Sequence, residues 1–205
     1  MSKMFLDSKQ PLSTCKNEKC DDCSVKSILN CHFNIKQLLK FIAIMIPGPI
    51  LSGYMIFIFN PLFLIPWIAL FILYFGFIEI RVMCSHCPHY AEPNLKSLKC
   101  WANYGSPKLW KYRPGPMSFL EKLIFYFGFI MIFSYPIPFY ILKSSIVSYL
   151  FLCIYTILIV SAFILLKKYY CSQCINFACP LNTVDSEKRK EFFKNNSIVK
   201  EAWEK

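Results

Sequence analysis

The sequence predicts an all-α integral membrane protein with four transmembrane helices arranged as two tandem hairpins, together with a cytosolic cysteine-rich loop and cysteine-rich tails. Two observations lead to this fold class. The chain is 56% hydrophobic and only 17% charged, which is too apolar for a soluble domain of 205 residues. Its charges are also segregated, because no Asp, Glu, Lys or Arg occurs from Phe41 to Ile78, and only Lys143 occurs from Leu123 to Leu166.

Each apolar block is long enough for two crossings, since a helix needs about 20 residues to cross a hydrocarbon core. We expect the first hairpin to turn at Asn60-Pro61, with Ser52-Gly53 as the alternative position. A kink is expected at Pro47-Gly48-Pro49. The predicted parts are an N-terminal tail at 1–34, a first hairpin at 35–80, a loop at 81–122, a second hairpin at 123–166 and a C-terminal tail at 167–205.

Three local expectations concern the polar segments. The first 34 residues lack the apolar core of a signal peptide, so the first apolar segment is expected to direct insertion. Glu79 and Arg81, at the end of the second apolar segment, are expected to reach the membrane interface with their long side chains. In the C-terminal tail, the spacing of apolar residues predicts an amphipathic helix from Ser186 to Trp203, lying on the membrane surface or on the cytosolic part.

Charge predicts the orientation. Four spans leave both tails and the middle loop on one side of the membrane, and 22 of the 23 Lys and Arg residues fall on that side. By the positive-inside rule we expect a multi-pass protein of the plasma (inner) membrane with both termini in the cytoplasm. Ten of the eleven cysteines and all three histidines then lie on a reducing side, where structural disulfides are rare. The same bias accounts for the net charge of +11, so no nucleic-acid partner is expected.

The middle loop carries the pattern Cys84-x2-Cys87-x12-Cys100, with His86 and His89 beside the pair. A Cys-x2-Cys turn presents two thiolates to one ion, and a more distant thiolate and an imidazole complete a tetrahedral set. The loop therefore predicts a metal site with three thiolates and one histidine. The alternative is that these cysteines stay reduced and pack at the membrane surface, where a thiol behaves as a small apolar group.

A second pair follows the last apolar segment, in the pattern Cys171-x2-Cys174-x4-Cys179. Three thiolates with one open position suit either an iron–sulfur cluster or a zinc site that borrows a fourth ligand. A different arrangement joins Cys84 and Cys87 to Cys171 and Cys174 as one four-thiolate site, since two hairpins related by a pseudo-twofold axis would bring the pairs together. Spacing alone leaves these arrangements open.

The N-terminal tail offers a third candidate metal site. Its pattern is Cys15-x4-Cys20-x2-Cys23-x7-Cys31, with His32 directly after it. The alternative for this segment is a disordered tail that happens to carry cysteines. Cys153, inside the fourth apolar segment, is expected to serve packing alone.

Aromatic and basic residues alternate after Cys100. Such residues anchor a protein at the level of the lipid headgroups and attract anionic lipid, so a bilayer with anionic headgroups is the expected partner. A more specific interpretation is an anion site in which Lys108, Lys111 and Arg113 grip a phosphate of a lipid or polyprenyl substrate.

Three functions fit this sequence. The first is a membrane protein that binds zinc or an iron–sulfur cluster and exchanges electrons with a redox or membrane protein partner or with a quinone. The second is a membrane scaffold or lipid-headgroup-binding protein with a structural zinc cap, and the third is a soft-metal handling protein. The spans carry no acid or histidine relay, which argues against proton-coupled transport. No phosphate loop, nucleophile elbow or paired-histidine protease motif is present, and enzyme activity stays an open question.

Overall fold

The computed structural model describes residues 10–21 and 23–204, and the regular elements in this part of the chain are helical, apart from one isolated bridge between Ser97 and Pro107. Positions 1–9, 22 and 205, which belong to the predicted tails, lie outside the described residues. The elements are α1 (Ile35–Met45), α2 (Pro47–Phe59), η1 (Pro61–Phe63), α3 (Leu64–Leu73), η2 (Tyr74–Ile78), α4 (Glu79–Val82), η3 (Cys84–His86), η4 (Pro88–Ala91), α5 (Phe119–Ser134), α6 (Ile137–Leu142), α7 (Ile146–Leu165), η5 (Leu166–Tyr170), η6 (Cys171–Gln173), α8 (Ser186–Asn195) and α9 (Ser197–Trp203).

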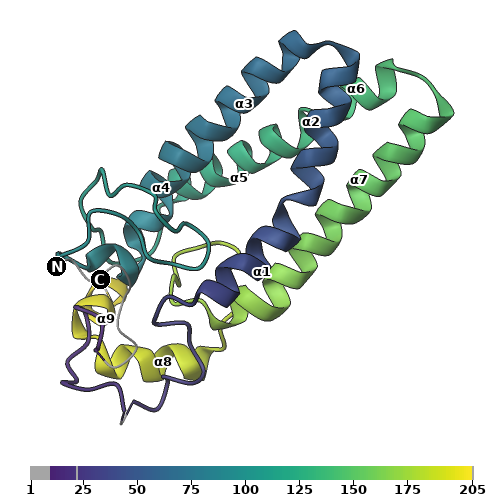
Figure 1. The fold of residues 1–205 in the computed structure, drawn as a ribbon. Coiled ribbons are helices and arrows are strands. Elements are labelled where there is room, and N and C mark those ends of the chain that lie inside the picture. The colour runs from purple at the N-terminus through teal and green to yellow at the C-terminus, as the bar shows by residue number, and fades with distance from the viewer. Residues whose placement is uncertain (1–9, 22, 205) are drawn as a thin grey trace.

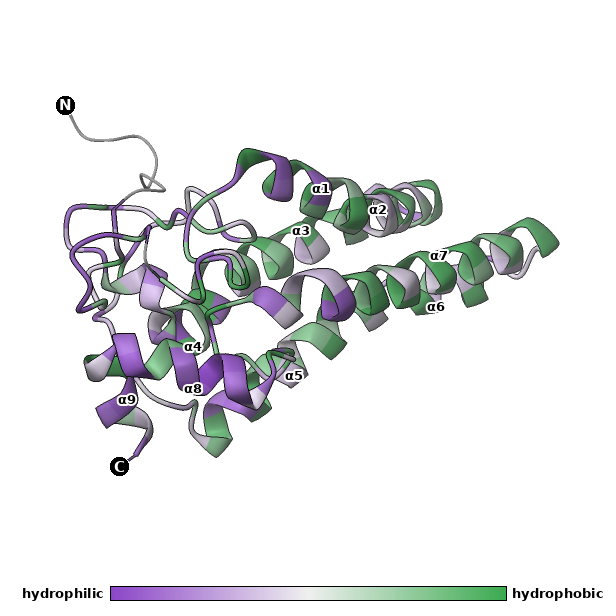
Figure 2. Ribbon diagram, turned by 90° about the horizontal axis from the view of Figure 1, so that it is seen from below, coloured by the Kyte–Doolittle hydropathy of each residue, from purple (hydrophilic) through white to green (hydrophobic). Residues whose placement is uncertain are grey.

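Four helical stretches in the described residues are long and apolar enough to cross a membrane, which confirms the all-α fold with four apolar helices. They lie side by side, and the remaining segments gather at one end of the bundle (Figure 1). Figure 2 shows hydrophobic residues along these helices and hydrophilic residues at that end. Large apolar side chains such as Ile65, Ile146 and Ile157 are exposed on the helices, as expected of a surface that contacts lipid. The stretches are Ile35–Phe59, Pro61–His86, Phe119–Leu142 and Ile146–Gln173.

Three of these stretches extend beyond the apolar segments read from the sequence. The second runs to His86 rather than to residue 80, and the fourth runs to Gln173 rather than to residue 166. The reason is that hydropathy ends at the first charges, whereas helical hydrogen bonding continues through them. The third begins at Phe119, because Ser118 and Glu121 form a capping box that starts α5.

Proline interrupts the first and third stretches. The first breaks at Ile46, directly before Pro47, where a kink is expected. Asn60 separates the first stretch from the second, at the turn position expected from Asn60-Pro61. Its side chain accepts a hydrogen bond from the N–H of Leu62, whereas the alternative turn position, Ser52-Gly53, lies inside α2. The third stretch breaks between Ser134 and Ile137.

The break in the third stretch has partners on the neighbouring helices. Pro136 has no N–H, so the carbonyl of Ile132 lacks its helical donor. The indole Nε1–H of Trp67 in α3 donates to that carbonyl at 3.3 Å. The hydroxyl of Tyr155 in α7 donates to the next carbonyl, that of Phe133, at 2.7 Å. In lipid such groups have no water to turn to, so these bonds fix α5 between α3 and α7.

The polar end is a cap built by three distant segments, namely residues 10–34, 87–118 and 174–204 (Figure 1). Its N-terminal and C-terminal segments share one apolar core. The buried members of that core are Leu12, Val25, Leu29, Cys31, Cys87, Ile175, Phe177, Phe192 and Val199.

The predicted single amphipathic helix from Ser186 to Trp203 is wrong, because α8 and α9 are separated at Asn196. Asn196 is buried, and its amide Nδ2–H donates to the carbonyl of Phe192 at 2.8 Å. The hydroxyl of Thr14 donates to Asn196 Oδ1 at 2.8 Å. These contacts hold the break against the N-terminal segment, so the pair of helices packs on the cap.

Gly128 in α5 tests the packing of this bundle. A Cβ at that position would lie 1.9 Å from Cε2 of Tyr74, whose hydroxyl is fixed on the carbonyl of Phe125 at 2.7 Å. We expect Gly128→Ala to lower the free energy of unfolding in detergent by about 1–3 kcal/mol, because the buried ring must move. Gly76→Ala is the matched control, since nothing lies within 4 Å of its Cβ position. Equal stability of the two variants in a denaturation titration would contradict the close packing of Tyr74 on Gly128.

Candidate functional site

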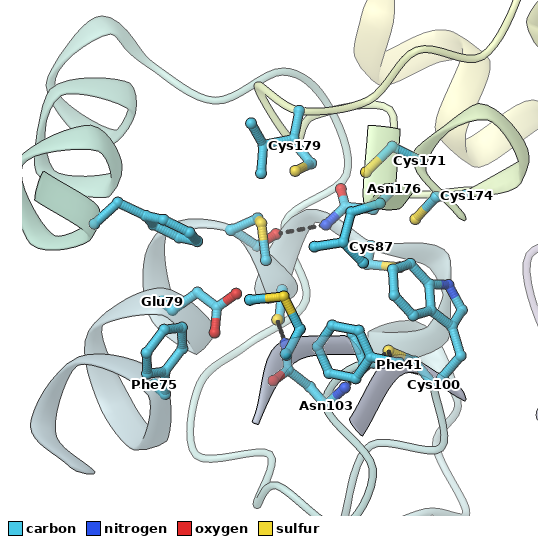
Figure 3. A pocket seen from close by; sticks show the side chains of 18 of the residues that line it. Phe41, Phe75, Glu79, Cys87, Cys100, Asn103, Cys171, Cys174, Asn176 and Cys179 are labelled. Carbon is cyan, nitrogen blue, oxygen red and sulfur yellow. Dashed lines mark hydrogen bonds between the residues drawn. The ribbon is translucent and has the colours of Figure 1, made fainter. Parts of the chain in front are cut away.

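A chamber of about 340 Å³ lies where the apolar helices meet the cap, and all four apolar stretches contribute to its wall. All eleven cysteines lie in the described part of the chain, and six of them line this chamber (Figure 3). Both halves of the chain supply thiols, so the structure brings together the two cysteine pairs that the sequence separates by more than 80 residues. The six are Cys84, Cys87, Cys100, Cys171, Cys174 and Cys179.

The two cysteine pairs lie on turns of the same shape. Cys84 and Cys171 each begin a 3₁₀ turn, and the N–H of the second cysteine donates to the carbonyl of the first, at 2.9 Å for Cys87 and 3.5 Å for Cys174. The backbone angles of the second cysteines are also close, with φ −77° and ψ 138° at Cys87 against φ −82° and ψ 129° at Cys174. The repeated Cys-Ser-x-Cys sequence therefore corresponds to a repeated local structure.

The serine in each turn explains the shared geometry. Ser85 Oγ donates to the carbonyl of Arg81 at 2.7 Å, and Ser172 Oγ donates to the carbonyl of Lys168 at 2.8 Å. Each bond occupies a carbonyl at the end of the helix, where no further helical N–H is available. The serine thus ends the helix and turns the cysteine pair toward the chamber.

The sulfurs of Cys84 and Cys100 accept hydrogen bonds from residues just after Cys100. Asn103 Nδ2–H donates to Cys84 Sγ at 3.1 Å (Figure 3). The backbone N–H groups of Ala102 and Asn103 both donate to Cys100 Sγ at 3.3 Å. Donors directed at sulfur stabilise the thiolate rather than the thiol, and they are the contacts that tune metal–thiolate centres.

Burial works against ionisation of the same sulfurs. Desolvation raises the pKa of Cys87 and of Cys174 well above the ordinary thiol value, and it raises the pKa of Cys179 to about 12. Neighbouring thiols add to the rise, since Cys87 interacts with Cys100 and Cys174 interacts with Cys87. The thiols are therefore neutral at pH 7, unless a cation enters the chamber and compensates their charge.

The two predicted histidines point in different directions. His89 lines the chamber, and its Nε2–H donates to the carbonyl of Asn30 at 3.3 Å, while no partner is found for Nδ1 in the described residues. Burial lowers the pKa of His89 to about 4, so the ring is neutral and Nδ1 carries a free lone pair. His86 lies outside the chamber lining, with Nδ1 donating to the carbonyl of Gly115 and Nε2 3.5 Å from Glu121.

Sequence reasoning missed four polar residues of the chamber, namely Glu79, Asn103, Asn176 and Asn182. The expectation that Glu79 reaches the membrane interface is wrong, because this side chain is only 6% exposed and its Oε2 has no partner in the described residues. Glu79 is buried because its side chain points from the second stretch into the chamber beside the cap. Asn176 Nδ2–H donates to the carbonyl of Met83 (Figure 3). The proximity of Glu79 to the Cys-x2-Cys pair in the sequence was the available signal.

Aromatic side chains line much of the chamber, and some of them, such as Phe41 and Phe125, pack in the same apolar clusters as the chamber cysteines. In the described residues the chamber wall includes seven phenylalanines, drawn from all four apolar stretches. They are Phe41, Phe71, Phe75, Phe125, Phe129, Phe133 and Phe163. The chamber thus combines thiols from the cap side with phenylalanines from all four apolar stretches.

The five remaining cysteines lie elsewhere. The four N-terminal cysteines surround a second, smaller cavity on the other side of the cap core, together with His32. These are Cys15, Cys20, Cys23 and Cys31. The expectation that Cys153 serves packing is wrong, because this residue is exposed on α7 and faces away from the bundle.

Two of the three cations proposed for an anion site have partners inside the protein. Lys108 Nζ donates to the carbonyl of Glu92 and lies over the ring of Tyr90. Arg113 Nη1 lies 2.6 Å from Glu121 Oε1. Lys111 is exposed. The anion site therefore stays a prediction.

In residues 10–21 and 23–204, no group of three or more Cys, His, Asp or Glu side chains is arranged to hold a metal ion as it stands. Comparison with protein-family models, with curated proteins and with solved structures finds no match.

Arg113 fixes the first cysteine turn, Cys84–Cys87, to α5. Its Nη2–H donates to the carbonyl of Arg81 at 2.7 Å and to Ser85 Oγ at 3.0 Å, while Nη1 pairs with Glu121. We expect Arg113→Ala to lower the free energy of unfolding by about 2 kcal/mol, because hydrogen bonds to a charged group are lost. We also expect faster alkylation of Cys84, measured by mass spectrometry of the full chain.

The control is Lys111→Ala, which removes an exposed cation of the same loop and should change stability by less than about 0.5 kcal/mol. If both variants alkylate at the wild-type rate, Arg113 does not hold the turn.

Proposed function

We propose that this chain is a multi-pass membrane protein that binds an iron–sulfur cluster in the thiol-lined chamber and carries electrons at the membrane surface. The observation that supports it most is that six thiols, supplied by both halves of the chain, line one cavity. Cysteine thiolates are the usual ligands of such clusters.

The size of the chamber favours a cluster over a single ion. Its volume of about 340 Å³ is roughly ten times the share of one water molecule in the liquid, about 30 Å³. The donors surround this space without converging on one point. Six thiols and the free Nδ1 of His89 are also more ligands than one tetrahedral ion uses.

The orientation is part of the proposal. With 22 of 23 basic residues on the side of the tails and the middle loop, the two helical hairpins leave the cap and the chamber thiols in the cytoplasm. That compartment is reducing, so the thiols remain available for metal. We accordingly place the protein in the plasma (inner) membrane, with the chamber opening between cytosol and lipid.

The proposed reaction is electron transfer without covalent change to the protein. An iron–sulfur cluster gains and loses one electron at a time. A soluble one-electron carrier in the cytosol is the proposed donor, and a quinone in the bilayer is the proposed acceptor. Two successive one-electron transfers, with two protons from water, convert the quinone to the quinol. The phenylalanines of the chamber wall support an apolar acceptor.

Metal analysis of the full chain, purified in detergent without oxygen, tests the proposal. We expect iron and acid-labile sulfide together, with visible absorption that bleaches on reduction. Cys87→Ser and Cys174→Ser, one from each half, should each lower the iron content more than about tenfold, since loss of supporting groups alone costs 10–100-fold in metal affinity. Cys153→Ser is the matched control, because this cysteine is exposed on α7.

Zinc without iron in the wild-type chain would reject the cluster and support a structural zinc cap instead. Iron that survives in both Cys87→Ser and Cys174→Ser would reject the chamber as its site.

A further inference from the structure

The cap holds a second group of thiols that the chamber does not use. Cys15, Cys20, Cys23 and Cys31 line a cavity of about 20 Å³ between the N-terminal segment and the break between α8 and α9. Phe192 and other residues of the cap close it. A cavity of this size holds about one water-sized particle, whereas the chamber holds many.

The four thiols are mutual neighbours. All four line the same small cavity, and Cys15, Cys23 and Cys31 also belong to, or pack against, one apolar core. Cys20 and Cys31 are buried, and Cys15 and Cys23 are half-buried. Four sulfurs therefore share one site, and no fifth residue is needed for a tetrahedral set.

The backbone around the middle pair forms a tight turn. The N–H of Cys23 donates to the carbonyl of Cys20 at 3.2 Å, and the N–H of Lys26 donates to the carbonyl of Cys23 at 3.1 Å. This places two thiols of a Cys-x2-Cys pair on one side of the turn. His32 lies beside the site, but its Nε2–H donates to the carbonyl of Gln10 at 2.8 Å, with Cys20 Sγ 3.8 Å away.

We propose that Cys15, Cys20, Cys23 and Cys31 bind one zinc ion as four thiolates. The sulfurs do not meet at a common point in the described structure, so binding draws them inward across the small cavity. Structural zinc sites have this composition and comparable spacing. The ion stabilises the fold by joining the start and the end of the N-terminal segment, in addition to the hydrogen bond between His32 and Gln10 and the shared cap core.

The zinc site lies next to the same apolar core as the first cysteine turn. Cys31 and Cys87 belong to the same buried core, and Asn30 accepts the hydrogen bond of His89. Asn196, which separates α8 from α9, accepts a hydrogen bond from Cys15 Sγ at 3.3 Å. The inference stands independently of the cluster in the chamber, because the two sets of thiols do not overlap.

Elemental analysis of the full chain tests this site. Cys20→Ser and Cys31→Ser should each remove one zinc per chain relative to wild type. Their iron-to-protein ratio should stay near that of wild type, so loss of this site and failure of the chamber proposal give different results. Cys153→Ser should keep the wild-type zinc content.

A second pair of variants separates ligation from misfolding. Cys23→His keeps a zinc ligand and should retain the ion, whereas Cys23→Ala should lose it. Cobalt(II) added to the metal-free chain should give the absorption bands of a tetrahedral sulfur site, and these should be absent in Cys20→Ser. A wild-type chain without zinc, or unchanged zinc in both Cys20→Ser and Cys31→Ser, would overturn the proposal.

Discussion

Six thiols meet at the end of an apolar helix bundle, where burial disfavours their charged forms and a bound cation would favour them. Burial raises the pKa of Cys87 and Cys174 far above the ordinary value, and the thiols oppose one another's ionisation. The N–H groups directed at Cys84 and Cys100 act in the opposite sense. A site with this balance is poorly suited to free thiolates and well suited to a cation that binds thiolates.

The rest of the fold maintains the chamber. Trp67 and Tyr155 hold α5 at its proline break, which keeps the phenylalanines of the chamber wall between the helices. Arg113 and Glu121 tie the middle loop to the start of α5 and so fix the first cysteine turn. The N-terminal and C-terminal segments close the chamber from the polar side through one apolar core.

Much of this arrangement follows from local sequence. The four apolar helices follow from hydropathy, and the repeated Cys-Ser-x-Cys turns follow from residues that hydrogen-bond within four positions of themselves. The sequence also offered, as one of two alternatives, the juxtaposition of Cys84 and Cys87 with Cys171 and Cys174. The structure shows that both pairs line one cavity, which spacing within each half could not reveal, and which thiols share an ion stays a prediction.

The residues that could not be predicted depend on distant contacts. The helix break at Asn196 is held by a hydrogen bond from Thr14, more than 180 positions away in the sequence. The helical spacing of apolar residues does not indicate this contact. From the sequence, Glu79 is expected at the membrane interface, because it follows an apolar segment. In the structure it is buried, and the neighbouring residues in the sequence do not indicate this burial. The hydrogen bond from Asn103 to Cys84 could not be predicted either, because Asn103 lies in an aromatic and basic segment whose composition indicates the membrane surface.

An anomalous-scattering map at the iron absorption edge, from crystals of the anaerobically purified full chain, tests most directly whether both halves share one cofactor. The shared chamber predicts iron density between Cys87 and Cys174, in contact with sulfurs from both cysteine turns. Density bound by the thiols of one half alone, or a chamber without iron density, would contradict this account.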